Sequence, residues 1–413
     1  MIKIVIIGGG TAGWLTGLYF NKIGYPDITI IESSRIGILG AGEGTSPSFA
    51  GFLERVEIDE NDFLKNTGAT IKVANDFINW SQYGGKYSHG FLPVSEFLKD
   101  DEKNIHGYHF DARECAKYFK KIGIDRGINH LDVNITKFTQ DGKGDIKQIH
   151  TEEKIDIDVD FVIDCSGFSR LCIGKLYNGK WRSYSDYLKV NSAIAYFLPQ
   201  ENKLIQKSKT HTQSIAMNSG WMWQAPLKHR WGCGYVFNDT YVTIEEAKEE
   251  VENYLNRKIE IVKTFKFDAG GYEKTWINNC VALGLASGFL EPLEATSLMT
   301  LILSIEKLAK IGLTNLEEQD YYNNYVNNIN YQSMLFVCHH YNCGRTDTKF
   351  WNDVNDLKLP PELAMAIDNL KIIKNNSDLS RYIKYEGKSP VFGIYNYKAV
   401  DLGHKTKTGK TLV

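Results

Sequence analysis

The stretch that decides the fold is "IKIVIIGGGTAGWLTGLYFNKIG", residues 2–24 of this 413-residue chain. A β-branched run from Ile2 to Ile7 leads into a glycine turn, and apolar residues at helical spacing follow the turn. A second β-branched run, Ile28 to Ile31, ends in Glu32. Strand, glycine turn, helix and strand form a βαβ unit, so the sequence predicts an α/β fold of Rossmann type.

The glycine turn "GGGTAG" satisfies the pattern G-x-G-x-x-G. Gly8 allows the tight turn, Gly10 lets the backbone approach a pyrophosphate, and Gly13 lets helix and strand pack closely. The unpaired N–H groups of the helix N-terminus favour an anion. Glu32 would accept hydrogen bonds from an adenosine ribose, and its charge disfavours a 2′-phosphate. A glycine turn without a ligand is the alternative, but this order of elements favours a dinucleotide.

Two later glycine turns favour FAD over NAD as that dinucleotide. They are "DCSGF" (residues 164–168) and "GLASGF" (residues 284–289). A chain that returns repeatedly to one extended ligand is typical of the flavin monooxygenases. No second G-x-G-x-x-G is present for NAD(P)H, so we expect a separate flavin reductase to reduce the flavin.

Composition excludes several other classes of function. The formal net charge is −2, so neither nucleic acid nor an anionic membrane is an expected partner. The seven cysteines are odd in number and form no CxxC pair, which is typical of reduced thiols. The apolar stretch 281–305 contains two glutamates and a proline and fails as a membrane span. With a β-type run so near the start and no visible signal peptide, we expect a cytoplasmic enzyme.

The rest of the chain divides into a mixed and a helical part. Residues 192–267 are rich in strand patterns, and the last hundred residues are helical in pattern. We therefore expect an FAD-binding domain at residues 1–312, interleaved with mixed-sheet strands for the substrate at about 192–267. Residues 313–413 would form a helical, substrate-side part.

Seven separated motifs then match one family. They occur in this order: "GGGTAGW", "GAGEGTSP", "GATIKVANDFINW", "YHFDA", "DCSGFSRLCI", "SIAMNSGWMWQAPL" and "NNCVALGLASGFLEPLEATS". Together they resemble the flavin-dependent halogenases, and the tryptophan halogenases most closely, over roughly residues 1–312. The family's Gly-Trp-x-Trp-x-Ile-Pro element is present as "GWMWQAP", residues 220–226, with Ala225 in place of isoleucine. The C-terminal region is shorter than in those enzymes.

The resemblance implies which residues hold the cofactor. The pyrophosphate would lie on the first glycine turn and the ribose on Glu32, while the loop "GAGEGTSP" would strap across the flavin. The implied cofactor-binding residues are Gly8, Gly10, Ala12, Gly13, Glu32, Ala41, Gly42, Glu43, Ile135 at the adenine end and Leu298 at the isoalloxazine.

The same resemblance implies that Lys72 and Glu294 are catalytic. In such enzymes reduced FAD, dioxygen and halide yield hypohalous acid, which travels to the lysine. An ammonium can polarise the hypohalous acid, and a desolvated amine could form a haloamine. A carboxylate at Glu294 can polarise the acid or stabilise positive charge on the ring. The plain alternatives are a solvated helix lysine and a carboxylate favoured by a helix dipole.

Halide and substrate positions also follow from the resemblance. Thr296 and Ser297 fall on the halide-binding positions, with Ser297 where the family usually has glycine. His89 and Phe91 match positions that flank the indole. The C-terminal "YIKYEGKSPVFGIYNY" lacks the Trp and Glu that clamp the amino acid. We therefore expect an open pocket for varied electron-rich aromatics rather than free tryptophan.

Trp221 and Trp223 lie two residues apart, so in a strand they share one face. The face is either plain core or a wall between flavin and Lys72 that keeps organic substrates from the flavin. Trp231 lies outside the motif and is best interpreted as core. The segment "CHHYNC", residues 338–343, fits a packed helix face better than a zinc pattern, so no metal is expected.

Three functions remain in competition. The first is halogenation with FADH2, dioxygen and halide, and the second is aromatic hydroxylation by a flavin monooxygenase. The third is a flavin-binding protein without catalysis. Lys72, Glu294 and the tryptophan motif together favour the halogenase, working as a monomer or as a homo-oligomer.

Overall fold

The computed structural model describes residues 2–38, 40, 42–91, 105–200, 210–384 and 390–405. Its helices are α1 (Thr11–Lys22), α2 (Ser48–Arg55), α3 (Glu60–Thr67), α5 (Ala112–Asp125), α6 (Ile244–Leu255), α7 (Thr296–Ile311), α8 (Gln319–Tyr341), α9 (Lys349–Asn355), α10 (Pro361–Asp368), α11 (Asn376–Leu379) and α12 (Ile394–Lys405). Among the described residues, no helix combines the length and the apolar character that crossing a membrane requires.

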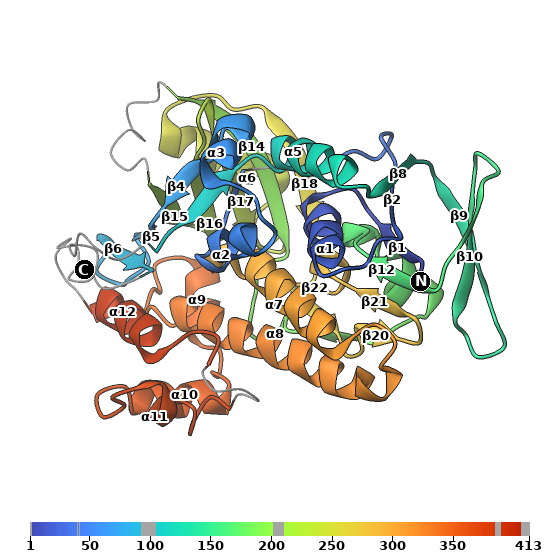
Figure 1. The fold of residues 1–413 in the computed structure, drawn as a ribbon. Coiled ribbons are helices and arrows are strands. Elements are labelled where there is room, and N and C mark those ends of the chain that lie inside the picture. Colours follow the sequence, from blue (N-terminus) through green and yellow to red (C-terminus); the bar gives the residue numbers. More distant parts are fainter. Residues whose placement is uncertain are drawn as a thin grey trace.

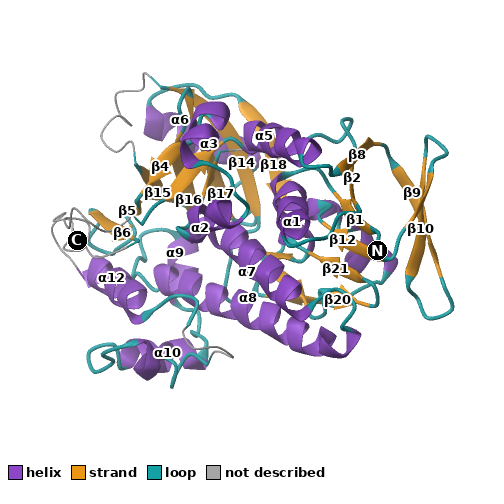
Figure 2. Cartoon of the chain, viewed as in Figure 1, coloured by secondary structure: helices purple, strands orange, loops and turns teal. Residues whose placement is uncertain are grey.

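The strands belong to one six-stranded, one seven-stranded and three smaller sheets. They are β1 (Ile4–Ile7), β2 (Ile28–Glu32), β3 (Glu43–Gly44), β4 (Thr70–Lys72), β5 (Ala74–Ile78), β6 (Lys86–Gly90), β7 (Gly107–Phe110), β8 (Asn129–Asp132), β9 (Ile135–Gln140), β10 (Ile146–Thr151), β11 (Asp156–Asp158), β12 (Phe161–Asp164), β13 (Trp181–Ser183), β14 (Ser192–Pro199), β15 (His211–Met217), β16 (Gly220–Pro226), β17 (Arg230–Phe237), β18 (Ile261–Lys266), β19 (Gly270–Tyr272), β20 (Trp276–Ile277), β21 (Cys280–Ala282) and β22 (Gly288–Phe289). Figure 2 shows α7, α8 and α12 packed along one side of the strands.

The six-stranded sheet confirms the predicted βαβ unit. Its order is β20-β21-β12-β1-β2-β8, and β1 pairs in parallel with both β2 and β12. All four residues of β1 are buried, as expected for a central parallel strand covered on both faces. Helix α1 covers this sheet with Trp14, Leu15 and Leu18 (Figure 1). The chain therefore has the α/β fold that the opening stretch predicts.

Three glycine turns meet at one edge of this sheet. Strands β1, β12 and β21 are parallel neighbours, so their carboxyl ends lie side by side. A Cβ on Gly8 would lie 2.3 Å from the Cys165 carbonyl oxygen, and one on Gly284 would lie 3.1 Å from the Ala12 Cβ. The turn after β12 is held by Asp164, whose carboxylate accepts the backbone N–H groups of Ser166 and Cys172. The sequence-based expectation that the chain returns to one place is confirmed.

The seven-stranded sheet contains the tryptophan motif. Its order is β18-β14-β17-β16-β15-β5-β6, and β16 lies in its centre with every residue buried. Trp221 and Trp223 belong to the core shared with the C-terminal helices, whereas Met222 and Trp231 pack on the opposite face near α6. The predicted strand, its shared tryptophan face and the core position of Trp231 are confirmed.

A small sheet, β3-β7-β4, joins the glycine-rich loop to Lys72. Strand β3 belongs to the "GAGEGTSP" loop, and β4 ends at Lys72. Lys72 is therefore a strand residue and buried, so the plain alternative of a solvated helix lysine is wrong. Thr70 in the same strand donates its hydroxyl hydrogen bond to the Pro226 carbonyl oxygen at 2.5 Å, which ties β4 to the end of β16.

The described residues beyond position 312 are mainly helical, as the sequence predicts. Helix α8 packs against α7, and α12 packs against both α8 and β6. Figure 1 shows α12 in red beside β6, so the end of the described chain lies next to an early strand. The domain boundary at residue 312 stays a prediction.

The segment "GYHFDARECAKYFKKIG", residues 107–123, predicts a helix with Asp111 as N-cap and Gly123 as its C-terminal stop. Helix α5 agrees with this expectation at its N-terminus and differs at its C-terminus. Asp111 is the N-cap, as predicted, and accepts the N–H of Arg113 at 2.9 Å. Gly123, expected to stop the helix, lies inside it, because the helix runs on to Asp125. Gly123 is needed for packing instead: a Cβ there would lie 2.6 Å from Cζ3 of Trp14.

We expect Gly123→Ala to destabilise the protein by about 1–3 kcal/mol through overpacking against Trp14. Ordinarily this change in a helix interior stabilises by up to about 1 kcal/mol. Gly51→Ala in α2 is the matched control, because its Cβ would meet only the flexible end of Arg55 at 3.2 Å. Urea unfolding of both variants measures the difference. Equal stabilisation by the two changes would contradict the packing role of Gly123.

Candidate active site

Lys72 is buried at the end of β4. The residue is 2% exposed, and its Nζ lies 5.6 Å from the centre of the Phe91 ring. A Cβ on Gly44 would lie 3.1 Å from that Nζ, so the glycine of β3 gives the ammonium its room. Burial lowers the pKa of Lys72 to about 8, while the charge of Glu294 acts in the opposite direction. Nζ of Lys72 makes no hydrogen bond or ion pair to another described residue, which leaves the ammonium available.

Glu294 reaches the same region from an unusual turn before α7. It lies in a short 3-10 turn, Leu293–Ala295, with φ 59° and ψ 16°. Ala295 follows with φ 55°. Two consecutive non-glycine residues in the left-handed region are energetically costly and persist only where surrounding contacts hold them. The turn directs the Glu294 carboxylate into the interior, where the residue is 7% exposed.

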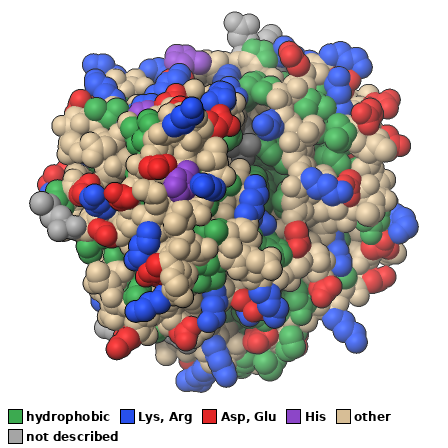
Figure 3. Space-filling model, turned by 90° about the vertical axis from the view of Figure 1, so that its right-hand side faces the viewer, with side chains coloured by type: hydrophobic (Ala, Val, Ile, Leu, Met, Phe, Trp, Pro, Cys, Tyr) green, Lys and Arg blue, Asp and Glu red, His purple; other side chains and the backbone are tan. Residues whose placement is uncertain are grey.

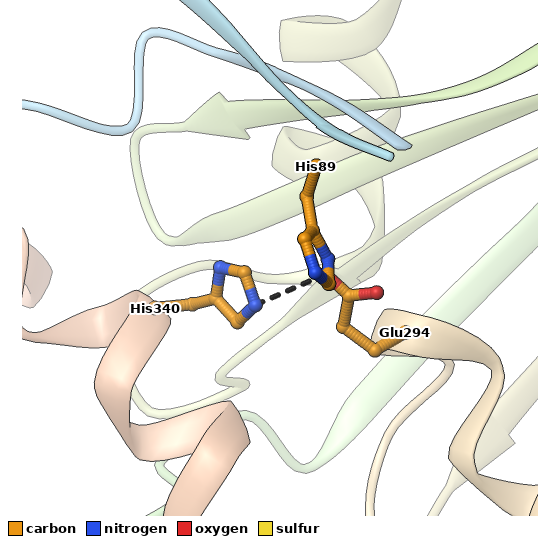
Figure 4. Close-up of side chains that lie close together, drawn as sticks. All are labelled: His89, Glu294 and His340. Atoms are coloured by element: carbon orange, nitrogen blue, oxygen red, sulfur yellow. Dashed lines mark hydrogen bonds and ion pairs between the residues drawn. The ribbon is translucent and has the colours of Figure 1, made fainter. Parts of the chain in front are cut away.

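Three side chains from three other elements hold the Glu294 carboxylate. Oε1 lies 2.7 Å from Nδ1 of His89 and 3.1 Å from Nε2 of His340, and Oε2 accepts from Nδ2 of Asn75 at 2.7 Å. Figure 4 shows both imidazole rings directed at the carboxylate, His89 from a strand and His340 from a helix. Burial alone would raise the pKa of Glu294, but His89 and His340 hold it well below its ordinary value. The carboxylate is therefore ionised.

The two histidines differ in their other contacts. His89 Nε2 lies 2.8 Å from the Asn396 side-chain oxygen, so both ring nitrogens face acceptors. Burial lowers the pKa of His89, but Glu294 and Asn396 raise it above the ordinary value overall. Burial lowers the pKa of His340, with Glu294 acting in the opposite direction. Glu294 therefore favours the charged form of His89, whereas burial favours the neutral form of His340.

His89, Glu294 and His340 also form a group that could hold a metal ion. One ligand atom from each lies within 4.8 Å of the others, and this is the one such group among the described residues. The contacts at 2.7 and 3.1 Å are ordinary hydrogen-bond and ion-pair distances that need no ion to explain them. The expectation that no metal is used stays a prediction.

The predicted halide residues lie at the N-terminus of α7. Thr296 and Ser297 are its first two residues, and the N-cap, Ala295, has no side chain that could satisfy their N–H groups. The Thr296 hydroxyl is buried without a hydrogen-bond partner. Unsatisfied donors at a helix N-terminus suit a small anion. The site is adjacent in sequence to Glu294.

The first glycine turn has room for a pyrophosphate. A Cβ on Gly10 would meet no atom within 4 Å, whereas one on Gly13 would lie 1.8 Å from the Gly8 carbonyl oxygen. The Thr11 hydroxyl is buried without a partner, and α1 has no side-chain cap. An open backbone edge, an orphaned hydroxyl and free helix N–H groups fit a dinucleotide. Figure 3 shows a hollow near the centre of one face of the molecule, with Lys and Arg side chains beside it.

Glu32 is held in place at the expected ribose position. Its Oε1 lies 2.7 Å from both Nζ of Lys120 and Nε2 of His130. Its Oε2 would lie 1.8 Å from a Cβ on Gly9, so the carboxylate lies against the glycine turn. This position suits a hydroxyl donor next to the turn.

The remaining predicted cofactor residues lie in several parts of the structure. A Cβ on Gly42 would lie 2.6 Å from the Gly232 Cα, so the strap loop packs tightly on β17. Burial, with the charge of Asp111, raises the pKa of Glu43 to about 7. Leu298 and Ile135 pack partly buried at the two core clusters beside the six-stranded sheet. Ala41 lies outside the described residues.

The tryptophan face is anchored to a second buried carboxylate. Trp221 Nε1 donates to Oε1 of Glu291 at 2.9 Å, and the Tyr341 hydroxyl donates to the same oxygen at 3.0 Å. Burial raises the pKa of Glu291 to about 8. Gly234 lies opposite Trp223, and a Cβ there would lie 2.0 Å from Cη2 of the indole. Both rings are therefore fixed in one orientation.

Sequence reasoning missed four site residues: Asn75, Glu291, His340 and Asn396. His340 lies in the "CHHYNC" segment, which is a packed helix face as expected but also contacts Glu294. A histidine in an apolar helix face was the available signal. Asn75 and Asn396 had none, because only the fold brings them to Glu294 and His89.

Comparison with known proteins identifies the family of the chain. A family model described as tryptophan halogenase matches residues 3–100 and 97–411. The chain belongs to the tryptophan halogenase family. The match extends beyond residue 312, where the motifs of the sequence resemblance end. The predicted fold class, the flavin-dependent halogenase activity and the cofactor FAD with halide follow from this membership, and an aromatic substrate is the family's class of substrate.

Individual relatives support the same conclusion. Tryptophan 6-halogenase SttH of Streptomyces toxytricini is 28% identical over 97% of this chain and 89% of its own. Its crystal structure superimposes with a TM-score of 0.89 at 27% identity, over 98% of this chain and 91% of that one. Xcc4156, a flavin-dependent halogenase from Xanthomonas campestris, superimposes with a TM-score of 0.87 at 27% identity, over 98% and 89%.

The buried charge of Lys72 in this halogenase gives a stability prediction. The difference between the ordinary pKa of 10.5 and about 8 corresponds to about 3 kcal/mol of destabilisation at neutral pH. The folded pKa lies below the unfolded one, so the cost is fully present below pH 8 and disappears as the pH rises towards 10.5. We expect Lys72→Met to raise the free energy of unfolding at pH 7, with a gain that shrinks above pH 8.

Chemical denaturation at several pH values measures this gain. Lys117→Met is the control, because Lys117 lies on the surface of α5 with its side chain 71% exposed. A loss of stability at pH 7 in the Lys72 variant would contradict the prediction.

Proposed function

We propose that this halogenase guides hypohalous acid to Lys72, where the acid halogenates an electron-rich aromatic ring. The observation that carries the proposal is the meeting of two groups in one buried region. These are the desolvated ammonium of Lys72 and the ionised carboxylate of Glu294. A structural role alone gives no reason to bury both charges.

The first part of the proposed reaction forms hypohalous acid, which is the oxidant. Reduced FAD, when bound, supplies the electrons that with dioxygen convert halide into hypohalous acid. The amides and hydroxyl at Thr296 and Ser297 would hold the halide. Trp221 and Trp223 would stand between the cofactor and the substrate, so that halide rather than an organic ring meets the oxidant. The fixed orientation of both indoles supports this assignment.

Lys72 and Glu294 would perform the transfer. The ammonium of Lys72 hydrogen-bonds the oxygen of hypohalous acid and makes the halogen more electrophilic. As the halogen joins the ring carbon, the Lys72 proton passes to the departing hydroxide and forms water. The ionised Glu294 stabilises the positive ring and then accepts the proton from that carbon. The net change is ArH + HOX → ArX + H2O.

The substrate is proposed to be a varied electron-rich aromatic, not free tryptophan. Phe91 lies within reach of Lys72 and supplies a stacking surface. The two ring nitrogens of His89 contact Glu294 and Asn396, so the ring would line the site in a fixed orientation. The absence of a Trp and Glu clamp in the C-terminal sequence supports a pocket that does not hold an amino acid.

The proposal includes the setting of the enzyme. A separate flavin reductase would supply FADH2 in the cytoplasm, and all seven cysteines are free thiols in agreement with a reducing compartment. Residues 1–312 would hold FAD with the strands of 192–267 interleaved, and residues 313–413 would close the substrate side.

We expect Lys72→Ala to lose at least about 100-fold in halogenation while binding FAD as the unchanged protein does, because the glycine turn proposed to hold FAD is separate from β4. Glu294→Gln should lose a similar factor. The assay supplies a flavin reductase, NADH, dioxygen and chloride, bromide or iodide, and detects halogen isotope patterns by mass spectrometry. Unchanged product from Lys72→Ala would mean that free hypohalous acid halogenates in solution.

The same assay separates the competing functions. Hydroxylated products without halogen would identify a monooxygenase, and flavin binding without any product would identify a catalytically silent protein.

A panel of phenols, indoles and free tryptophan tests the substrate class. We expect turnover of several non-amino-acid aromatics at rates at least about tenfold above that of tryptophan, because no clamp holds the amino acid. The kcat/KM of each compound is the measurement. Product with tryptophan alone would overturn this assignment.

A further inference from the structure

Two buried carboxyl groups lie in one short segment before α7, at Glu291 and Glu294. Glu294 takes part in the proposed transfer, whereas Glu291 has no part in it. Only Pro292 and Leu293 separate the two residues. The ring of Pro292 fixes its φ, and Leu293 is buried in the core shared with the C-terminal helices. A short and stiff piece of chain therefore connects the two carboxyl groups.

One helix contacts both carboxyl groups through neighbouring residues. Nε2 of His340 lies 3.1 Å from Oε1 of Glu294, and Figure 4 shows His340 reaching it from a helix. The Tyr341 hydroxyl donates to Oε1 of Glu291 at 3.0 Å. Neighbouring residues of a helix point about 100° apart, so the two side chains of α8 reach two separate points of the turn.

The seven-stranded sheet contacts the same two carboxyl groups. Trp221 of β16 donates from Nε1 to Oε1 of Glu291 at 2.9 Å. Asn75 of β5 donates from Nδ2 to Oε2 of Glu294 at 2.7 Å. Each carboxyl group thus has one partner from the sheet and one from α8. The turn between them is bonded to both elements.

The backbone of this turn requires such support. Glu294 and Ala295 both have a positive φ, at 59° and 55°, without being glycine. Residues in this conformation persist only where the surrounding structure holds them. The bonds to Glu294 act on the strained residue itself, and those to Glu291 hold the chain three residues earlier.

We propose that Glu291 is a positioning residue, which holds this turn so that the Glu294 carboxylate and the candidate halide site at Thr296 keep their places. This inference rests on the proposed function. Glu291 acts by accepting the hydrogen bonds of Trp221 and Tyr341, which join the turn to β16 and α8. It does so without touching the aromatic substrate or the halide.

Glu291 holds the turn without adding a second full charge to it. Burial raises the pKa of Glu291 to about 8. Burial acts in the same direction at Glu294, but His89 and His340 hold that pKa well below its ordinary value. At pH 7 Glu291 is therefore mostly neutral, and its carbonyl oxygen still accepts hydrogen bonds. Glutamine offers the same acceptor without a charge, so Glu291→Gln is the conservative variant.

Nitrogen NMR of 15N-histidine-labelled protein tests the positioning role without catalysis. His89 is the reporter, because it bonds to Glu294 and belongs to β6 rather than to the turn or α8. Glu291→Met removes the acceptor and keeps a side chain of similar length. We expect it to move the His89 signals towards those of a neutral ring, because Glu294 favours the charged form. Glu291→Gln should leave them in place.

Kinetics test the consequence for the reaction. We expect kcat for halogenation to fall at least about tenfold in Glu291→Met, because small displacements of a reacting group are costly. The KM for halide should rise at least about threefold, since Thr296 lies on the same turn. Glu291→Gln should change either value by less than about threefold. A smaller fraction of folded protein would lower kcat but leave the KM for halide unchanged.

Tyr341→Phe is the second variant and decides alone if Glu291→Met does not fold. It removes one hydrogen bond to Glu291 and keeps the ring that packs on Trp80 and Trp351. We expect changes of the same direction in the His89 signals and in the KM for halide. They should be smaller than in Glu291→Met, because the second hydrogen bond to the carboxyl group remains.

Tyr196→Phe is the control for the loss of a buried hydroxyl. Tyr196 is fully buried on the opposite face of the seven-stranded sheet, where its hydroxyl donates to the Met222 sulfur. We expect unchanged His89 signals and an unchanged KM for halide. Changes as large as those in Tyr341→Phe would overturn the positioning role, because they would follow from the loss of any buried hydroxyl.

The remaining outcomes separate the positioning role from the proposed function. Unmoved His89 signals and an unchanged KM for halide in Glu291→Met and Tyr341→Phe would overturn the role and leave halogenation intact. A loss in Glu291→Gln as large as in Glu291→Met would also overturn it. If the unchanged protein halogenates no compound of the panel, the proposed function fails. Shifted His89 signals would then still establish that Glu291 positions Glu294.

Discussion

The rest of the active site depends on the burial of one negative charge, the carboxylate of Glu294. An ionised carboxylate away from water is costly unless donors surround it. Here His89 and Asn75, which lie 205 and 219 positions earlier in the chain, supply two of them. His340 supplies a third neighbour from α8. The contacts that satisfy this carboxylate therefore come from both halves of the chain.

The backbone around Glu294 has a strained conformation that places the carboxylate in the interior. Two successive left-handed residues without glycine are stable only when packing and hydrogen bonds outweigh their cost. The same turn leaves α7 without a side-chain cap and the Thr296 hydroxyl without a hydrogen-bond partner. One local conformation thus creates both the carboxylate position and the candidate halide site. The carboxylate position and the candidate halide site are coupled because the same backbone turn forms both.

Close approach of backbone governs the cofactor side. At Gly8, Gly13 and Gly42 a Cβ would collide with another strand or turn, whereas at Gly10 it would meet nothing. The lack of a side chain at the first three positions lets these segments pack closely. The open position at Gly10 leaves room for a ligand. Gly44 extends this constraint to Lys72, because the absence of a side chain at Gly44 leaves room for the ammonium.

The sequence by itself determined the βαβ unit, the glycine turn with Glu32, the tryptophan strand and the candidate pair Lys72 and Glu294. These features depend on local spacing, or on motifs whose residues are neighbours in the chain. Only the tertiary structure decided that His340 and Asn75 contact the Glu294 carboxylate. It also decided that Gly123 packs on Trp14 and does not end a helix. It likewise brought Trp221 and Tyr341 to Glu291. Such contacts join elements that are distant in the sequence, and local propensity carries no information about which side chains meet across a packed interior.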